Sequence, residues 1–174
     1  MGKRSEFARV ERDFYPTPLD AVKPLLPHLE RGSVFYEPCA GNGILIKHLE
    51  SAGHYCCGSS DIEPQENNIK KLDVFLLREG RGKMFITNPP WTRKILHPLI
   101  SHLLTIGQSC WLLFDSDWVH TQQSIPFLPQ LKKIVSVGRV KWIPNSPSVG
   151  KDNCAWHLFS SMISDEILFV GRKK

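Results

Sequence analysis

Residues 33–52 read SVFYEPCAGNGILIKHLESA, and this stretch indicates the class of fold. Residues 33–36 are a short apolar run, which predicts a strand, and residues 44–52 repeat apolar side chains at helical spacing. Residues 37–43, a turn with two glycines, join the two elements. Glycine lets a backbone turn sharply and approach a ligand, and the following helix offers free N–H groups. We therefore expect a strand–turn–helix unit with a ligand at the turn.

Short β-rich runs alternate with helical patterns along the rest of the chain. This is typical of an α/β fold with a mostly parallel sheet flanked by helices. A helix is expected over residues 95–106, and residues 118–131 are expected to be partly helical because Pro126 and Pro129 interrupt them. Further strands are expected at residues 54–59, 73–77, 84–87, 110–114, 134–143, 155–160 and 166–170.

No internal repeat, low-complexity tract or long linker divides the sequence. We expect a flexible polar segment at residues 1–12 and a single domain at residues 13–174, since 174 residues with 41% hydrophobic content suit one packed core. No apolar run reaches the ~20 residues that span a bilayer. Residues 1–11 carry charges where a signal peptide needs an apolar block, so neither secretion nor membrane insertion is expected.

The charged residues and the potential metal ligands indicate which binding partners to expect. The five cysteines are odd in number and contain no C-x-x-C pair, so we expect reduced thiols and a cytoplasmic location. The seven histidines lack zinc-site spacing, so no metal is expected. A formal net charge of +5 and a pI of about 9.0 favour a polyanion such as nucleic acid. Scattered Lys and Arg pairs are equally compatible with a solvated surface.

Two carboxylates suggest what the glycine turn binds. Glu37 stands at the carboxyl end of the first expected strand, where a cationic group could lie. Asp61 ends the second expected strand, and a carboxylate there can accept the hydroxyls of an adenosine ribose. A helix-capping role for Asp61 stays open. A dinucleotide-binding G-x-G-x-x-G is not present because Ile46 stands where its third glycine would be.

Asn88-Pro89-Pro90-Trp91 follows the expected strand at residues 84–87, at the end where open α/β sheets bind ligands. The two prolines stiffen this segment and contribute no N–H groups. The Asn88 side-chain oxygen and the Pro89 carbonyl can therefore accept the two hydrogens of an aryl amine and draw its nitrogen toward tetrahedral geometry. Trp91 offers a flat face on which a base can stack.

From roughly Asp13 to Val170, the chain resembles the class I S-adenosyl-L-methionine-dependent methyltransferases of the adenine-N6 type. The segment Phe14-Tyr15-Pro16-Thr17-Pro18 is similar to the family's N-terminal cofactor segment, and Asn88–Trp91 to its catalytic tetrapeptide. The resemblance implies a seven-stranded sheet with a reversed last strand and catalytic residues Asn88, Pro89, Pro90 and Trp91. The S-adenosyl-L-methionine site that it implies consists of Tyr15, Thr17, Glu37, Pro38, Cys39, Ala40, Gly41, Asn42, Gly43, Asp61, Ile62, Asp73, Val74 and Asn88.

The expected reaction is methyl transfer to the N6 amine of adenine in nucleic acid, DNA before RNA. No segment is long enough for a separate target-recognition domain, so loops, a second copy or a partner subunit must supply recognition. The alternatives are an RNA adenine-N6 methyltransferase, a protein-glutamine methyltransferase and a non-catalytic cofactor-binding subunit. The residues expected to contact nucleic acid are Arg93, Lys94, Trp118, Arg139, Lys141 and Lys151.

The remaining tryptophans and a pair of carboxylates receive structural interpretations. Asp115 and Asp117 follow an expected strand, and capping or a loop contact is expected rather than acid–base chemistry. Trp111, Trp142 and Trp156 fall in apolar runs and are expected in the core.

Overall fold

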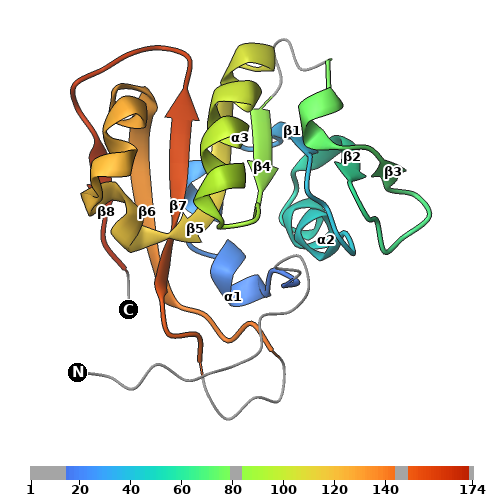
Figure 1. Cartoon of the computed structure of the whole chain (residues 1–174). Coiled ribbons are helices and arrows are strands. Elements are labelled where there is room, and N and C mark those ends of the chain that lie inside the picture. The colour runs from blue at the N-terminus through green and yellow to red at the C-terminus, as the bar shows by residue number, and fades with distance from the viewer. Residues whose placement is uncertain (1–14, 79–83, 144–148, 173–174) are drawn as a thin grey trace.

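The computed structural model describes residues 15–78, 84–143 and 149–172. Its strands form one sheet in the order β3-β2-β1-β4-β5-β7-β6-β8 (Figure 1). In chain order they are β1 (Val34–Glu37), β2 (Tyr55–Asp61), β3 (Lys70–Lys71), β4 (Met84–Thr87), β5 (Ser109–Asp115), β6 (Leu131–Arg139), β7 (Asn153–Ser160) and β8 (Leu168–Val170).

The strand directions divide the sheet into two halves. β3, β2, β1, β4 and β5 are parallel neighbours, whereas β7 runs antiparallel to both β5 and β6. β8 is parallel to β6 at the end of the sheet. The expected mostly parallel α/β fold is confirmed, with eight strands in the described residues and β7 as the reversed strand. The carboxyl ends of β1, β4, β5, β6 and β8 consequently lie at one edge of the sheet.

Helices cover both faces of the sheet. α1 (Leu19–Val22) and α2 (Ile44–Ser51) pack on one face, and α3 (Arg93–Ile106) packs on the other. The short 3-10 helices are η2 (Leu26–His28), η3 (Val74–Leu76), η4 (Ser116–His120) and η5 (Gln122–Gln130). Among the described helices, of which α3 is the longest, none combines the length and apolar character that a membrane crossing needs.

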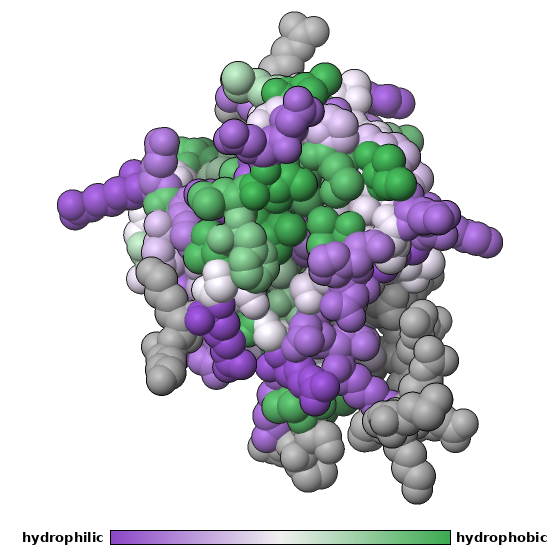
Figure 2. Space-filling model, turned by 90° about the vertical axis from the view of Figure 1, so that its left-hand side faces the viewer, coloured by the Kyte–Doolittle hydropathy of each residue, from purple (hydrophilic) through white to green (hydrophobic). Residues whose placement is uncertain are grey.

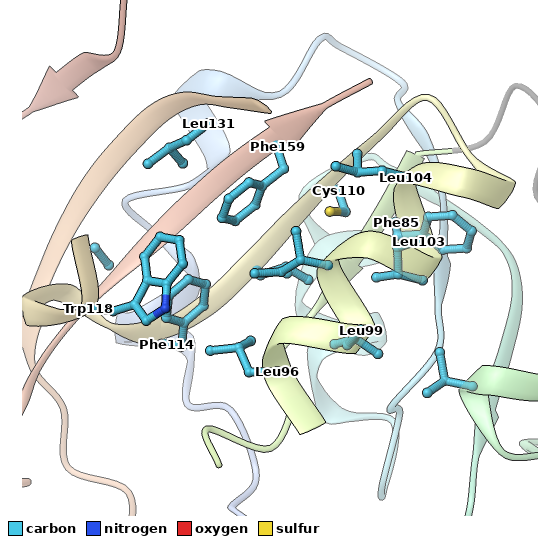
Figure 3. Packing of buried hydrophobic residues seen from close by; sticks show 14 of the residues in the cluster. Phe85, Leu96, Leu99, Leu103, Leu104, Cys110, Phe114, Trp118, Leu131 and Phe159 are labelled. Carbon is cyan, nitrogen blue, oxygen red and sulfur yellow. The ribbon is translucent and has the colours of Figure 1, made fainter. Parts of the chain in front are cut away.

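The core side chains of each strand alternate between the two faces of the sheet, with a period of two residues. On β5, Cys110, Leu112 and Phe114 face α3, whereas Trp111 and Leu113 face α1 and α2. Figure 3 shows the α3 side, where Leu96, Leu99 and Leu103 point toward the strands. Because both faces of the central strands are buried, these strands read as continuous apolar runs in the sequence.

Two local predictions were wrong or incomplete. The expected strand at residues 73–77 is instead the 3-10 helix η3, because the Asp73 carboxylate accepts the Phe75 N–H at 3.0 Å and caps a helical turn. A short apolar run does not distinguish a strand from a buried turn of helix. α1 and η2 were not predicted, since prolines interrupt the apolar pattern of residues 16–27.

The sheet ends at β8 with exposed apolar side chains. Figure 2 views the molecule from the side on which β8 lies and shows apolar residues across the middle of that face, bordered by hydrophilic ones. The large exposed hydrophobic residues of β8 and of the segment before it are Met162, Ile163, Leu168 and Phe169.

Candidate functional site

The glycine turn borders a cavity of about 450 Å³, here named the turn cavity. Gly41 and Gly43 have φ values of 53° and 70°, a left-handed conformation that favours glycine. The Gly43 N–H donates to the Ala40 carbonyl at 2.7 Å, and Gly43 is the residue before the first turn of α2. At its two glycines the turn therefore brings backbone and the start of a helix, rather than side chains, close to the cavity.

Asp61 ties the end of β2 to this turn. Its Oδ2 accepts the Gly41 N–H and its Oδ1 accepts the Glu63 N–H, each at 2.8 Å. The Ala40 N–H also donates to the Ser60 carbonyl at 3.0 Å. An ionised carboxylate offers about four acceptor positions, so Asp61 can still accept hydroxyl donors from a ligand in the cavity.

Glu37 contributes an unpaired buried oxygen to the same wall. Its side chain is 2% exposed, and its Oε2 has no hydrogen-bond partner among the described residues. Burial raises the pKa of Glu37 well above its ordinary value, and the nearby Asp61 carboxylate raises it further. A positively charged ligand group would supply the missing partner and favour the ionised form.

Cys39 lies beside these carboxylates and stays a neutral thiol. Burial raises its pKa, and the negative charges of Asp61 and Glu37 raise it further. A thiol of this kind is a poor nucleophile. Its part in the cavity is that of a small apolar wall.

The turn cavity gathers all but one of the residues predicted to bind a cofactor, and Gly43 supports the turn beneath it. It also contains residues that the sequence did not indicate, such as Phe75 and Ile95, because their place depends on how η3 and α3 pack. The lining residues are Tyr15, Pro16, Thr17, Glu37, Pro38, Cys39, Ala40, Gly41, Asn42, Ile44, Leu45, Asp61, Ile62, Glu63, Gln65, Asp73, Val74, Phe75, Asn88, Pro90, Ile95 and Leu99.

Asn88 is held in one orientation by its neighbours. Its Nδ2 donates to Thr17 Oγ1 at 3.1 Å and to the Tyr15 carbonyl at 3.4 Å, while its Oδ1 accepts the Trp91 indole N–H at 3.3 Å. A carbonyl only accepts and an indole N–H only donates, so these contacts fix which end of the amide faces which neighbour. The Trp91 Nε1 also donates to the Leu113 carbonyl at 3.1 Å, which anchors the loop to β5.

A second cavity, of about 240 Å³, also has Asn88 in its wall and is named here the aromatic cavity. Trp91 meets Trp142 edge to face, with ring centroids 5.8 Å apart, and Tyr15 lies 6.3 Å from Trp142. Asn88 and Tyr15 line both cavities. The aromatic cavity is lined by Tyr15, Asn88, Pro89, Trp91, Thr92, Trp142, Gly150, Lys151 and Asp152.

Trp142 lies in a position that differs in part from the one predicted from the sequence. The core placement expected for it is confirmed only in part, because it packs against the core but is only partly buried and also lines the aromatic cavity. Trp111 and Trp156 are buried as expected. The apolar neighbours of Trp142 in sequence do not reveal that it follows the end of β6, where the chain reaches the edge of the sheet.

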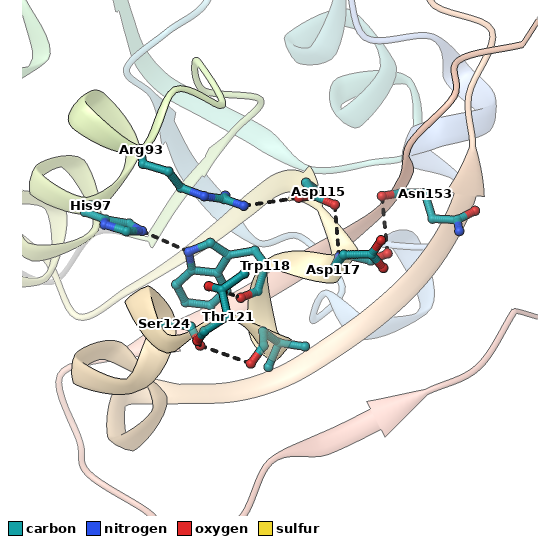
Figure 4. A network of polar contacts seen from close by, with 10 residues as sticks. Arg93, His97, Asp115, Asp117, Trp118, Thr121, Ser124 and Asn153 are labelled. Atoms are coloured by element: carbon teal, nitrogen blue, oxygen red, sulfur yellow. Dashed lines mark hydrogen bonds and ion pairs between the residues drawn. The ribbon is translucent and has the colours of Figure 1, made fainter. Parts of the chain in front are cut away.

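Trp118 and Arg93, both expected to contact nucleic acid, lie in a polar network beside the core (Figure 4). Trp118 is fully buried against Phe114, so the prediction that it contacts nucleic acid is wrong. Its indole N–H donates to His97 Nε2 at 2.9 Å. Burial, and then the charge of Arg93, lower the pKa of His97, which agrees with a neutral ring accepting that bond.

Arg93 forms an ion pair with Asp115 at 3.2 Å, so its charge is partly satisfied within the protein. Asp115 also accepts the Asp117 N–H at 2.9 Å and caps η4, which confirms the capping role expected for it. The other cations expected to contact nucleic acid, Lys94, Arg139, Lys141 and Lys151, are exposed. Of these, Lys151 lines the aromatic cavity.

Comparisons with known proteins give structural but not sequence neighbours. No protein-family model matches the chain, and neither does any curated protein sequence. A Pyrococcus horikoshii protein provisionally described as an RNA methyltransferase is 17% identical, with a TM-score of 0.58 over 91% of each chain. The 23S rRNA methyltransferase ErmE is 12% identical, with a TM-score of 0.56 over 88% of this chain and 72% of its own.

Protein 1320 of Thermoplasma acidophilum is 15% identical, with a TM-score of 0.56 over 80% of this chain and 81% of its own. At such identities, similarity of structure establishes the fold and leaves the chemistry to the site. The fold of this chain is thus the Rossmann-like fold shared with these methyltransferases.

Proposed function

We propose that this protein is an S-adenosyl-L-methionine-dependent methyltransferase that modifies the exocyclic N6 amine of adenine in nucleic acid. The observation that carries the proposal is the position of Asn88, which borders both the turn cavity and the aromatic cavity. A group transferred from a ligand in one cavity to a ligand in the other would pass this amide.

The residues of the turn cavity fit the proposed cofactor. Its volume of about 450 Å³ lies within the usual range for small-molecule sites, about 300–1,000 Å³. The unpaired Oε2 of Glu37 suits the ammonium group of the methionine part, and Asp61 can accept ribose hydroxyls. Asp73 and Ile62 would border the adenine. When bound, S-adenosyl-L-methionine supplies an electrophilic methyl group on a sulfonium.

Asn88 and Pro89 would hold the acceptor amine. The bonds to Thr17 and Tyr15 occupy the Asn88 amide hydrogens, and Oδ1 keeps a second lone pair beside the bond from Trp91. Pro89 has no N–H and offers only its carbonyl. Two such acceptors bind the two hydrogens of an aryl amine and favour tetrahedral nitrogen, which makes its lone pair available to the methyl group.

The aromatic cavity suits a flat acceptor. Trp91, Trp142 and Tyr15 surround it with ring surfaces, and stacking of a base on an aromatic side chain contributes about 1–3 kcal/mol. A base that reaches this cavity must be unpaired or flipped out of a duplex, which costs a few kcal/mol. Since Trp91 already donates its N–H to Asn88 and Leu113, it also fixes the amide that receives the amine.

The test measures methylated nucleosides by mass spectrometry after DNA and RNA are incubated separately with the protein and S-adenosyl-L-methionine. N6-methyladenine in either pool supports the proposal, and the pool in which it forms identifies the polymer, which the sequence-based hypothesis expects to be DNA. Asn88→Ala should lower the yield of product about 10²–10³-fold while cofactor binding, measured by calorimetry, is retained. Asn67→Ala, an exposed asparagine outside both cavities, is the matched control. Equal product from Asn88→Ala and wild type would refute the role of Asn88.

A further inference from the structure

A third cavity, of about 540 Å³, lies between α1 and the ends of β6 and β8. It is at the same edge of the sheet as the two cavities described above, because β6 and β8 run in the direction of β5. Valine and proline side chains contribute much of its wall. The Asp, Lys and Arg residues that line it are Asp20, Lys23, Arg139, Lys141 and Arg172. We name this cavity the basic groove.

Among the described residues, few carboxylates balance the positive charge of the basic groove. Its one carboxylate, Asp20, pairs with Lys23 at 2.8 Å. Within the described part of the chain, no carboxylate forms an ion pair with Arg139, Lys141 or Arg172. These cations come from the end of β6 and from the segment after β8, so only the folded chain brings them together.

Gly138 allows Arg172 to lie against β6. Its φ is 88°, and a Cβ built there would stand 3.1 Å from Nη1 of Arg172. A side chain at this position would therefore press against the guanidinium and strain the backbone, whose positive φ favours glycine. Without one, Arg172 packs against the residue that immediately precedes Arg139, and the two cations line the same groove.

The basic groove adjoins the aromatic cavity. The Gly150 N–H donates to the Val140 carbonyl at 2.7 Å and holds two chain segments together. Lys141 lines the basic groove and the next residue, Trp142, lines the aromatic cavity. The walls of the two sites therefore share a stretch of chain in which consecutive Cα atoms are about 3.8 Å apart. A single strand of nucleic acid with one base in the aromatic cavity could thus continue directly into the basic groove.

We propose that the basic groove binds the phosphodiester backbone of the nucleotides that flank the target base in a single strand. This rests on the proposed function and adds the surface that holds the substrate. Phosphate contacts by exposed Arg and Lys side chains supply affinity with little dependence on sequence. The groove would therefore retain the substrate with little regard to the sequence around the target base.

The test is binding of a fluorescent single-stranded oligonucleotide that contains one adenine, measured by anisotropy over a range of salt concentrations. In single strands each phosphate contact contributes about 0.7 to the slope of log K against log salt, so losing one weakens binding about five-fold at about 0.1 M salt. We expect losses of this size for Arg139→Gln, Lys141→Gln and Arg172→Gln, a larger loss for the triple variant and a shallower salt slope.

The control is a charge-matched triple variant, Lys47→Gln, Lys70→Gln and Lys71→Gln, at exposed positions outside all three cavities. It should bind like wild type. Equal affinity and salt slope for the groove variant and wild type would overturn the proposal, as would a polyglutamate probe that displaces the oligonucleotide equally well per charge. If groove-dependent binding occurs but no methyladenine forms, the proposed function fails while the groove stands. If methylation occurs with a KM that the groove variant leaves unchanged, the groove fails and the function stands.

Discussion

The parallel half of the sheet and the half built on β7, β6 and β8 carry groups of opposite charge at the edge that they share. The parallel half surrounds the turn cavity with the glycine turn and with the acidic residues Glu37, Asp61 and Asp73. The other half, with the segments that follow β6 and β8, contributes Trp142 and the cations of the basic groove. Acidic groups thus lie where a cationic cofactor is proposed, and basic groups where a polyanion is proposed.

The two halves also differ in how their residues are brought together. The turn cavity depends largely on one short segment, residues 37–43, and on two acids at the ends of the next elements. The aromatic cavity and basic groove combine residues from the loop after β4, from α1, from β6 and the segment that follows it, and from the segment after β8. Asn88 lies where the two regions meet. Substitutions of Asn88 should therefore reduce methyl transfer more than substitutions confined to either region.

The largest expected effect is that of Asn88→Ala on catalysis. Removing one acceptor that strengthens its contacts in the transition state lowers turnover by about 10²–10³. The measurement is single-turnover methyl transfer, with cofactor and oligonucleotide affinities determined in parallel. Thr17→Val, which removes only the contact that orients the amide, should give a smaller loss. A variant Asn88→Ala that loses cofactor binding instead would place Asn88 in the cofactor region alone.

Asp61→Ala should selectively weaken binding of the cofactor. Hydrogen bonds to a charged group contribute about 1.5–3 kcal/mol, so S-adenosyl-L-methionine affinity should fall about 10- to 150-fold, as measured by calorimetry. Oligonucleotide affinity should not change, because Asp61 lines neither the aromatic cavity nor the basic groove. Asp117→Ala, outside all three cavities, provides the control. A parallel loss of oligonucleotide binding would contradict the separation of the two regions.

Buried groups in the two halves should give opposite dependence of stability on pH. Burial lowers the pKa of His157, on β7, to about 3. Among the described residues, no group lies in hydrogen-bonding geometry with its ring nitrogens. The unfolded chain therefore takes up the proton first. The stabilisation is present above the ordinary pKa of about 6.5 and is lost below it, by roughly 2 kcal/mol between pH 7.5 and 5.

Glu37 should act in the opposite direction, since burial raises its pKa. Its contribution is present below the ordinary pKa of the carboxyl and is lost as pH rises through the folded-state value. Denaturant unfolding of wild type, His157→Phe and Glu37→Gln across this pH range would separate the two. A pH dependence unchanged by His157→Phe would mean that this ring titrates equally in the folded and unfolded chains.

The smallest expected effect is that of Trp142→Ala on the KM for the oligonucleotide. Losing one stacking surface should raise the KM for the oligonucleotide about five-fold, which corresponds to the lower end of base–aromatic stacking energies, about 1 kcal/mol. Trp142→Phe should retain most of the affinity because a ring remains. Cofactor affinity should be unchanged in both variants, and a change there would show that Trp142 supports the turn cavity as well.

The sequence by itself determined the α/β class of fold, the strand–turn–helix unit around residues 37–43 and the position of Asn88 after β4. Each of these depends on local geometry: glycine conformations, proline restrictions and the spacing of apolar residues. Only the tertiary structure decided that Trp118 is buried, that Trp142 lines a cavity and that Arg172 joins Arg139. Burial of an aromatic ring or pairing of a cation depends on which distant element packs against it, and spacing along the chain does not encode that choice.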